Sequence, residues 1–190
     1  MNTFITPNEV LPLNGKEEIL PGITVRHVWA WALGDLRLNA NRRALAQFLV
    51  TNAVGDARLR DDGWRDFDVL TPEGIKVEVK SSGYLQSWRQ ARPSKIVFSG
   101  LMGRSWTEEA GRGATPEVRA DVFVFAGHTC QDPNAYDPLD LGAWAFYVLP
   151  ATIFRQIGQK SVGLPRVRSL GGIPLAWSEL RSAVLLAASR

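Results

Sequence analysis

The sequence comprises 190 residues, of which 45% are hydrophobic and 22% are charged, and it contains no low-complexity segment. This length and composition are typical of one globular domain with a substantial core, and they exclude a fibrous or disordered chain. A formal charge of +3 and a pI of about 9.3 permit a polyanionic partner without requiring one.

Neither export nor membrane insertion is expected from the sequence. Residues 1–15 lack the basic start and the apolar core of a signal peptide, and no apolar run approaches the roughly 20 residues that a membrane helix needs. The single cysteine, Cys130, cannot form a disulfide within the chain. We therefore expect a cytoplasmic protein that does not associate with a membrane.

The first regular pattern in chain order is helical. Apolar residues recur at helical spacing from residue 24 to residue 36. A second predicted helix begins at Asn39 or Asn41 and stops at Gly55. Arg42 and Arg43 at its start suit either a phosphate contact or a solvated first turn.

The most informative stretch, residues 64–88, predicts two short strands joined by a turn at residues 71–74, where Pro and Gly mark a change of direction. Alternation along the strands separates an apolar face from a charged face. If the hairpin is centred on Glu73, Asp68 lies opposite Glu78 with Cβ atoms roughly 4.5–5.5 Å apart, so both carboxylates can hold one small cation. The apolar face holds Phe67, Val69, Ile75, Val77 and Val79, and the charged face holds Asp66, Asp68, Glu78 and Lys80.

A solvated face would also explain this alternation, because antiparallel hairpins often have one wet side. Two features of the following residues favour a functional site instead. Ser81, Ser82 and Gly83 are small and permit close approach of another backbone. The next residues mix aromatic and basic groups in a way that suits a nucleic-acid surface: Tyr84, Gln86, Trp88, Arg89, Arg92 and Lys95.

The remaining elements complete the predicted fold class. Later strands are predicted at residues 95–98, 121–127 and 144–149, a loop at residues 100–117, a short helix at residues 151–159, and a last helix after Ser178. This order predicts an α/β (α+β) fold with a central mixed sheet of four or five strands flanked by helices. We expect an extended lead-in over residues 1–23 and a single domain over residues 24–190.

Two smaller groups of residues carry weaker signals. Lys160, Arg166 and Arg168 add positive charge in a Gly- and Pro-containing segment, which suits either a phosphate contact or a soluble loop. His128 and Cys130 do not predict a zinc site, because a structural site usually needs four ligands and the chain has just one further histidine.

An Asp on one strand followed by Glu-x-Lys on the next resembles the signature of the PD-(D/E)XK nucleases, the restriction-endonuclease-like superfamily. Here the signature is Asp68, then nine residues, then Glu78-Val79-Lys80, and the resemblance covers roughly residues 24–150. The chain departs from the pattern in two places. No Pro precedes Asp68, and Gln47 is the nearest candidate for the acid that many members place on the preceding helix.

The resemblance implies a restriction-endonuclease-like fold and a metal-dependent endonuclease that hydrolyses phosphodiester bonds, with DNA as the expected substrate. It implies that Asp68 and Glu78 bind Mg²⁺ or Mn²⁺, with Asp66 in reserve, and that Lys80 orients the attacking water. Gln86 resembles a polar residue that helps to hold the site after the lysine, and Gln47 would orient metal-bound water. The predicted nucleic-acid contacts are Arg89, Arg92, Lys95, Lys160, Arg166 and Arg168.

Two alternatives stay open at this point. A module of the same fold could bind nucleic acid without cutting it, and Gln47 favours this if it marks a degenerate site. A carboxylate-pair glycosidase is the other, but Lys80 and the lack of an aromatic sugar platform in the hairpin argue against it. The sequence leaves open whether the substrate is DNA or RNA and whether two chains act as a homodimer.

Overall fold

The computed structural model describes residues 13–55, 66–103, 106–107, 111–112 and 115–190, and its contacts divide the chain into two units, Met1–Asp35 and Leu36–Arg190. In the first unit, strands β1 (Glu18–Leu20) and β2 (Ile23–Thr24) pair ahead of helix α1 (Val25–Leu33). The described part of the expected lead-in therefore contains a strand pair. Its expected end after residue 23 falls inside β2, and α1 belongs to this first unit.

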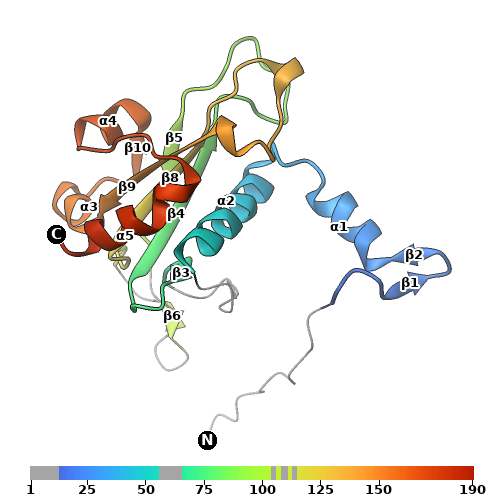
Figure 1. Cartoon of the computed structure of the whole chain (residues 1–190), viewed down its shortest axis with the longest axis horizontal. Helices are drawn as coiled ribbons and strands as arrows, with labels where there is room; N and C mark the ends of the chain where they lie inside the picture. Colours follow the sequence, from blue (N-terminus) through green and yellow to red (C-terminus); the bar gives the residue numbers. More distant parts are fainter. Residues whose placement is uncertain (1–12, 56–65, 104–105, 108–110, 113–114) are drawn as a thin grey trace, which may run out of the picture. The chain divides into compact units, whose positions relative to one another are not determined.

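The second unit is built on a four-stranded sheet of order β3-β4-β8-β9 (Figure 1). Its strands are β3 (Val69–Leu70), β4 (Lys76–Gly83), β8 (Val122–His128) and β9 (Trp144–Pro150). Because β4 and β8 run parallel while the other neighbours are antiparallel, the sheet is mixed. Strand β8 is buried along its whole length, as its continuous apolar sequence predicts for a central strand.

Helices and a small strand pair cover the two faces of this sheet. Helices α2 (Asn39–Val54) and α5 (Leu180–Ala188) pack on one face against buried valines of β4 and β8 (Figure 1). The other face packs against β5 (Val97–Ser99), β10 (Ser161–Gly163), α3 (Ala151–Ile157) and α4 (Leu164–Ser169). The predicted mixed α/β class, with a four-stranded mixed sheet flanked by helices, is confirmed.

The smaller elements differ in part from expectation. The predicted strand near residue 97 forms β5, but it pairs with β10 outside the central sheet. The region expected to be a loop contains a strand pair, β6 (Trp106–Thr107) and β7 (Gly111–Arg112). Short 3-10 helices span Pro133–Ala135, Leu141–Ala143 and Trp177–Glu179. Among the described residues, no helix is long and apolar enough to cross a membrane.

Strands β3 and β4 form the predicted hairpin. The Gly74 N–H donates to the Thr71 carbonyl at 2.9 Å, and Gly74 has a φ of 83°, which favours glycine at this turn. Val69, Val77 and Val79 are buried against α2, as expected. Phe67 is not part of this buried group. Strand β3 is short, so the alternation that would have buried Phe67 does not extend to it.

Candidate active site

The charged residues of β4 lie on the face of the sheet away from α2. In the parallel register, Glu78 pairs with Phe123 and Lys80 pairs with Phe125. Paired residues of neighbouring strands point to the same face, so Glu78 and Lys80 share the side on which β5 and β10 pack. The predicted alternation therefore holds along β4, with its valines facing the helix.

Glu78 and Lys80 contact each other directly. The Lys80 Nζ donates to Glu78 Oε1 at 2.5 Å, and the two side chains are mostly buried. Burial is the main cause that raises the pKa of Glu78 to about 6, the negative charge of Asp68 adds to it, and Lys80 opposes it. Above that pH the Glu78 carboxylate is ionised in a mostly buried site, which costs electrostatic free energy. An additional nearby cation would reduce that cost.

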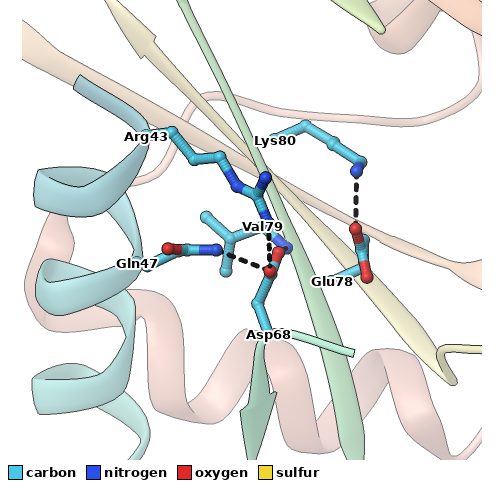
Figure 2. Close-up of polar contacts among 6 residues, drawn as sticks. All are labelled: Arg43, Gln47, Asp68, Glu78, Val79 and Lys80. Carbon is cyan, nitrogen blue, oxygen red and sulfur yellow. Dashed lines mark hydrogen bonds and ion pairs between the residues drawn. The ribbon is translucent and has the colours of Figure 1, made fainter. Parts of the chain in front are cut away.

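Asp68 is held by donors from α2 and β4. Its Oδ1 accepts hydrogen bonds from Arg43 Nη2 at 3.0 Å and from Gln47 Nε2 at 2.5 Å, and its Oδ2 accepts from the Val79 N–H at 2.7 Å. Figure 2 shows Asp68 turned toward α2 and Glu78 turned toward Lys80. The Asp68 carboxylate is thereby fixed at the edge of β4, immediately before the short strand β3 begins.

The two carboxylates are near enough for repulsion between them to contribute to the raised pKa of Glu78. Among the described residues, no group of three or more acidic, histidine or cysteine side chains could hold a metal ion. Mg²⁺ is suited to such a pair, because it takes one or two protein carboxylates and keeps several waters. The N–H and C=O of one strand residue point to the same side, so the Val79 carbonyl also faces this edge. An all-oxygen donor set of this kind fits Mg²⁺ or Mn²⁺.

Asp66, the reserve ligand, does not join this group. Its carboxylate pairs with Arg119 at 3.0 Å. The structure thus joins Gln47 to Asp68 and Lys80 to Glu78, with the two carboxylates near enough to repel each other, and it places Asp66 in a separate ion pair.

Gln86 is tied to the backbone around the site. Its Oε1 accepts from Arg42 Nη2 at 2.8 Å, and its Nε2 donates to the Gly83 carbonyl at 2.9 Å. Arg42 is 1% exposed and lies directly against Gly83, where an added Cβ would come within 2.8 Å of its guanidinium. Gln86 therefore supports the segment that follows β4, and its predicted part was to help hold the site after the lysine.

A largely polar hollow of about 550 Å³ opens beside Lys80. A second hollow of about 430 Å³ shares Gln86 and Trp88 with it. The predicted nucleic-acid residues divide between them. Lys95 lines the first and Arg89 and Arg92 line the second.

The more distant basic residues are arranged differently. Arg168 donates to the Tyr147 hydroxyl at 3.0 Å and lines a third hollow together with Lys95. The Lys160 carbonyl accepts from the N–H groups of residues 100 and 101, and neither Lys160 nor Arg166 lines these three hollows.

Arg42 and Arg43 were expected as phosphate contacts or solvated residues. Arg42 is instead buried in the fold, whereas Arg43 is exposed and pairs with Asp68. Both positions had a signal in the sequence. Arg42 precedes Ala46, Val50 and Val54 at a spacing of four, which places it on the buried face of α2. Arg43 precedes Gln47 by four residues, so the two share one helix face and both reach Asp68.

Comparison with known proteins adds no family assignment. No protein-family model matches the chain, and no curated protein matches it.

Proposed function

We propose that the protein is a metal-dependent endonuclease of the PD-(D/E)XK type that hydrolyses phosphodiester bonds in nucleic acid, with DNA as the substrate. The observation that supports this most is the Glu78–Lys80 contact beside the charge-coupled Asp68, at the edge of a polar hollow. A phosphodiester is already anionic, so its hydrolysis requires carboxylates that hold a metal ion and a cation that stabilises developing negative charge. Two acids and a lysine can supply these groups.

Each residue has a distinct part in this proposal. A bound Mg²⁺ would neutralise negative charge and lower the pKa of a water molecule. Asp68 and Glu78 supply the carboxylates that hold it, and Gln47 and Arg43 fix the orientation of Asp68. The Lys80 ammonium stabilises negative charge as it develops on the phosphate oxygens. Lys95 and the arginines of the neighbouring hollow attract the nucleic-acid backbone.

A second candidate function is supported by the surroundings of Asp68. Its carboxylate receives three hydrogen-bond donors from this chain alone, so its charge is compensated without a metal ion. A module that binds nucleic acid but does not cut it would have such an arrangement.

The decisive experiment is the Lys80→Ala variant, assayed for Mg²⁺-dependent cleavage of single- and double-stranded DNA and RNA. We expect a loss of roughly 10²–10³ in rate with binding in a chelator almost unchanged, because the lysine acts mainly on charge that develops in the transition state. Lys76→Ala is the matched control, since Lys76 is an exposed lysine at the start of the same strand.

The outcomes separate the candidates. If the parent protein binds a nucleic acid but cuts none with Mg²⁺ or Mn²⁺, the non-cutting module is correct. If cleavage survives Lys80→Ala, Asp68→Asn and Glu78→Gln undiminished, the active site lies elsewhere. Log affinity should fall linearly with log salt, by roughly 0.9 per phosphate neutralised on duplex DNA. Absence of binding at low salt, or a flat salt response, contradicts both candidates.

A further inference from the structure

Trp88 is an exposed aromatic side chain that lines the hollow beside Lys80. It follows β4 by five residues, 57% of it is exposed, and it contributes to the walls of both hollows. The ring is exposed where the two hollows meet, so a ligand in either hollow can reach it.

The loop that presents Trp88 is closed by its own hydrogen bonds. The Ser94 N–H donates to the Tyr84 carbonyl at 2.8 Å, which joins the two ends of the loop. Gln90 links residues across this loop. Its Nε2 donates to the Tyr84 carbonyl and to Ser94 Oγ, and its Oε1 accepts from the Gln86 N–H. The indole is thus carried on a preorganised backbone.

A buried cation anchors the same loop to helix α2. Arg42 donates to the Leu85 carbonyl at 2.9 Å and to Gln86 Oε1 at 2.8 Å. Its own exposure of 1% means that the guanidinium serves the interior of the protein rather than the solvent. Residues from α2 and the end of β4 therefore set the position of Trp88 relative to Lys80.

The charges around the indole limit what it can bind. Lys80 and Lys95 line the first hollow, on the catalytic side, and Arg89 and Arg92 line the second hollow. A flat apolar ring flanked by cations on both sides complements a molecule that alternates flat rings with negative charges. Nucleotides of a single strand have this chemistry, because their bases stack on aromatic side chains while basic groups track the phosphates.

We propose that Trp88 is a stacking platform for an unpaired base next to the phosphate that is cleaved, so that the substrate is single-stranded or locally unpaired nucleic acid. The base lies on the indole and enters the second hollow, whose volume of about 430 Å³ lies within the range of small-ligand sites. A paired base cannot make this contact, because in a duplex it is stacked between its neighbours. This inference rests on the proposed function of the adjoining site.

The test compares Trp88→Ala and Trp88→Phe with the parent protein for binding to a 20-nucleotide oligothymidine and to a 20-base-pair duplex, both in a chelator. Loss of one base–aromatic stack should weaken oligothymidine binding by roughly 5- to 150-fold in Trp88→Ala, and Trp88→Phe should retain most of the affinity. Duplex binding should change less than twofold. Trp31→Ala is the control, since Trp31 is 88% exposed and belongs to the other unit.

Three results would overturn the inference. They are an equal loss for oligothymidine and duplex, no loss for either, or conversion of a dimeric parent into a monomer by Trp88→Ala in sedimentation, which would make Trp88 a subunit contact. Cleavage assays keep the two proposals apart. A selective binding loss in a protein that cuts nothing supports the platform and rejects the nuclease. Cleavage without any effect of Trp88→Ala supports the nuclease and rejects the platform.

Discussion

Asp68 and Glu78 are both buried acids of one hairpin, yet their surroundings differ. Asp68 receives two side-chain donors from α2 and one main-chain donor from β4. Glu78 pairs with Lys80, two residues further along its own strand, and its pKa is raised to about 6, mainly by burial. One carboxylate is thus well compensated by the fold, and the other retains an electrostatic cost.

This difference suits the two carboxylates to different roles: Asp68 would orient a bound metal ion, and Glu78 would contribute most to its affinity. A carboxylate that is already hydrogen-bonded offers a fixed oxygen geometry, whereas one that is poorly compensated gains most from a cation. A metal ion between them would be oriented by Asp68 and stabilised mainly through Glu78. Substitution of each acid therefore tests whether the two contributions are distinct.

The largest expected effect is shared by both acids. Asp68→Asn and Glu78→Gln should each reduce Mg²⁺-dependent cleavage by at least about 10²-fold, because each removes a ligand charge. Binding of nucleic acid in a chelator should stay the same or become slightly tighter, since repulsion of phosphate decreases. Asp66→Asn is the control, because Asp66 pairs with Arg119. Retained cleavage in either of the first two variants would remove that acid from the site.

Substitution of the two acids should change the free energy of unfolding of the metal-free protein in opposite directions. Asp68→Asn should lower the free energy of unfolding by about 1–3 kcal/mol, because the new amide N–H₂ must face either the Val79 N–H or the donors of α2. Denaturation in urea with a chelator measures this. If Asp68→Asn leaves the protein as stable as the parent, the donors around Asp68 contribute little.

Glu78→Gln should change stability in the opposite direction. The folded-state pKa of about 6 lies above the ordinary value of 4.5, so the ionised carboxyl costs roughly 2 kcal/mol above pH 6 and nothing below pH 4.5, where it is protonated in both states. Loss of the Lys80 contact offsets part of the gain. We expect the variant to be more stable than the parent by about 1 kcal/mol at pH 8, or roughly 2–4 °C in melting temperature.

The pH dependence of stability tests whether the gain expected for Glu78→Gln comes from removal of the charge. The difference between Glu78→Gln and the parent should disappear as the pH falls from 6 to 4.5. A constant difference across that range would mean that the variant acts through packing. For the same reason, Mg²⁺ affinity should weaken as the pH falls through about 6, because the metal must displace a proton from Glu78.

The smallest effect concerns the exposed partner of Asp68. The Arg43 side chain is 55% exposed, whereas that of Asp68 is 5% exposed. Arg43→Ala removes a cation that competes for the carboxylate, and because such an exposed partner is strongly screened we expect a gain in Mg²⁺ affinity of roughly two- to fivefold. Titration calorimetry with Mg²⁺ measures it, with Arg119→Ala as the control. Weaker Mg²⁺ binding would mean that Arg43 supports the ligand geometry.

Much of the fold was predictable from the sequence, because the periodicity of apolar residues indicates which side chains are buried. The alternation in residues 75–80 and the continuous apolar run of β8 predicted the hairpin and the central strand. The pairing of β5 with β10 was not predictable, because strand periodicity does not identify the partner of a strand. Phe67 was misplaced because the two-residue strand β3 begins only at Val69, after Phe67.

The site itself was predictable in part. Asp68, Glu78 and Lys80 followed from their spacing on the hairpin, together with the family resemblance. The donors that hold Asp68 come from α2, and contact between a helix and a strand edge depends on tertiary packing. Gln86 was expected to help hold the site, but no local pattern indicates that its amide joins Arg42 to Gly83.

Strand β3 spans two residues at the edge of the sheet, and just before it the Asp68 side chain accepts a hydrogen bond from the Val79 N–H of β4. Edges with so few ladder bonds open locally at a lower free energy than the interior of a sheet, so amide hydrogens there exchange sooner with solvent. The hydrogen bond of the Asp68 carboxylate to the Val79 N–H therefore stabilises the pairing of β3 with β4 at this edge. Any ligand that engages it in the closed state also slows local unfolding of the hairpin, and the Val79 amide is placed to report that coupling.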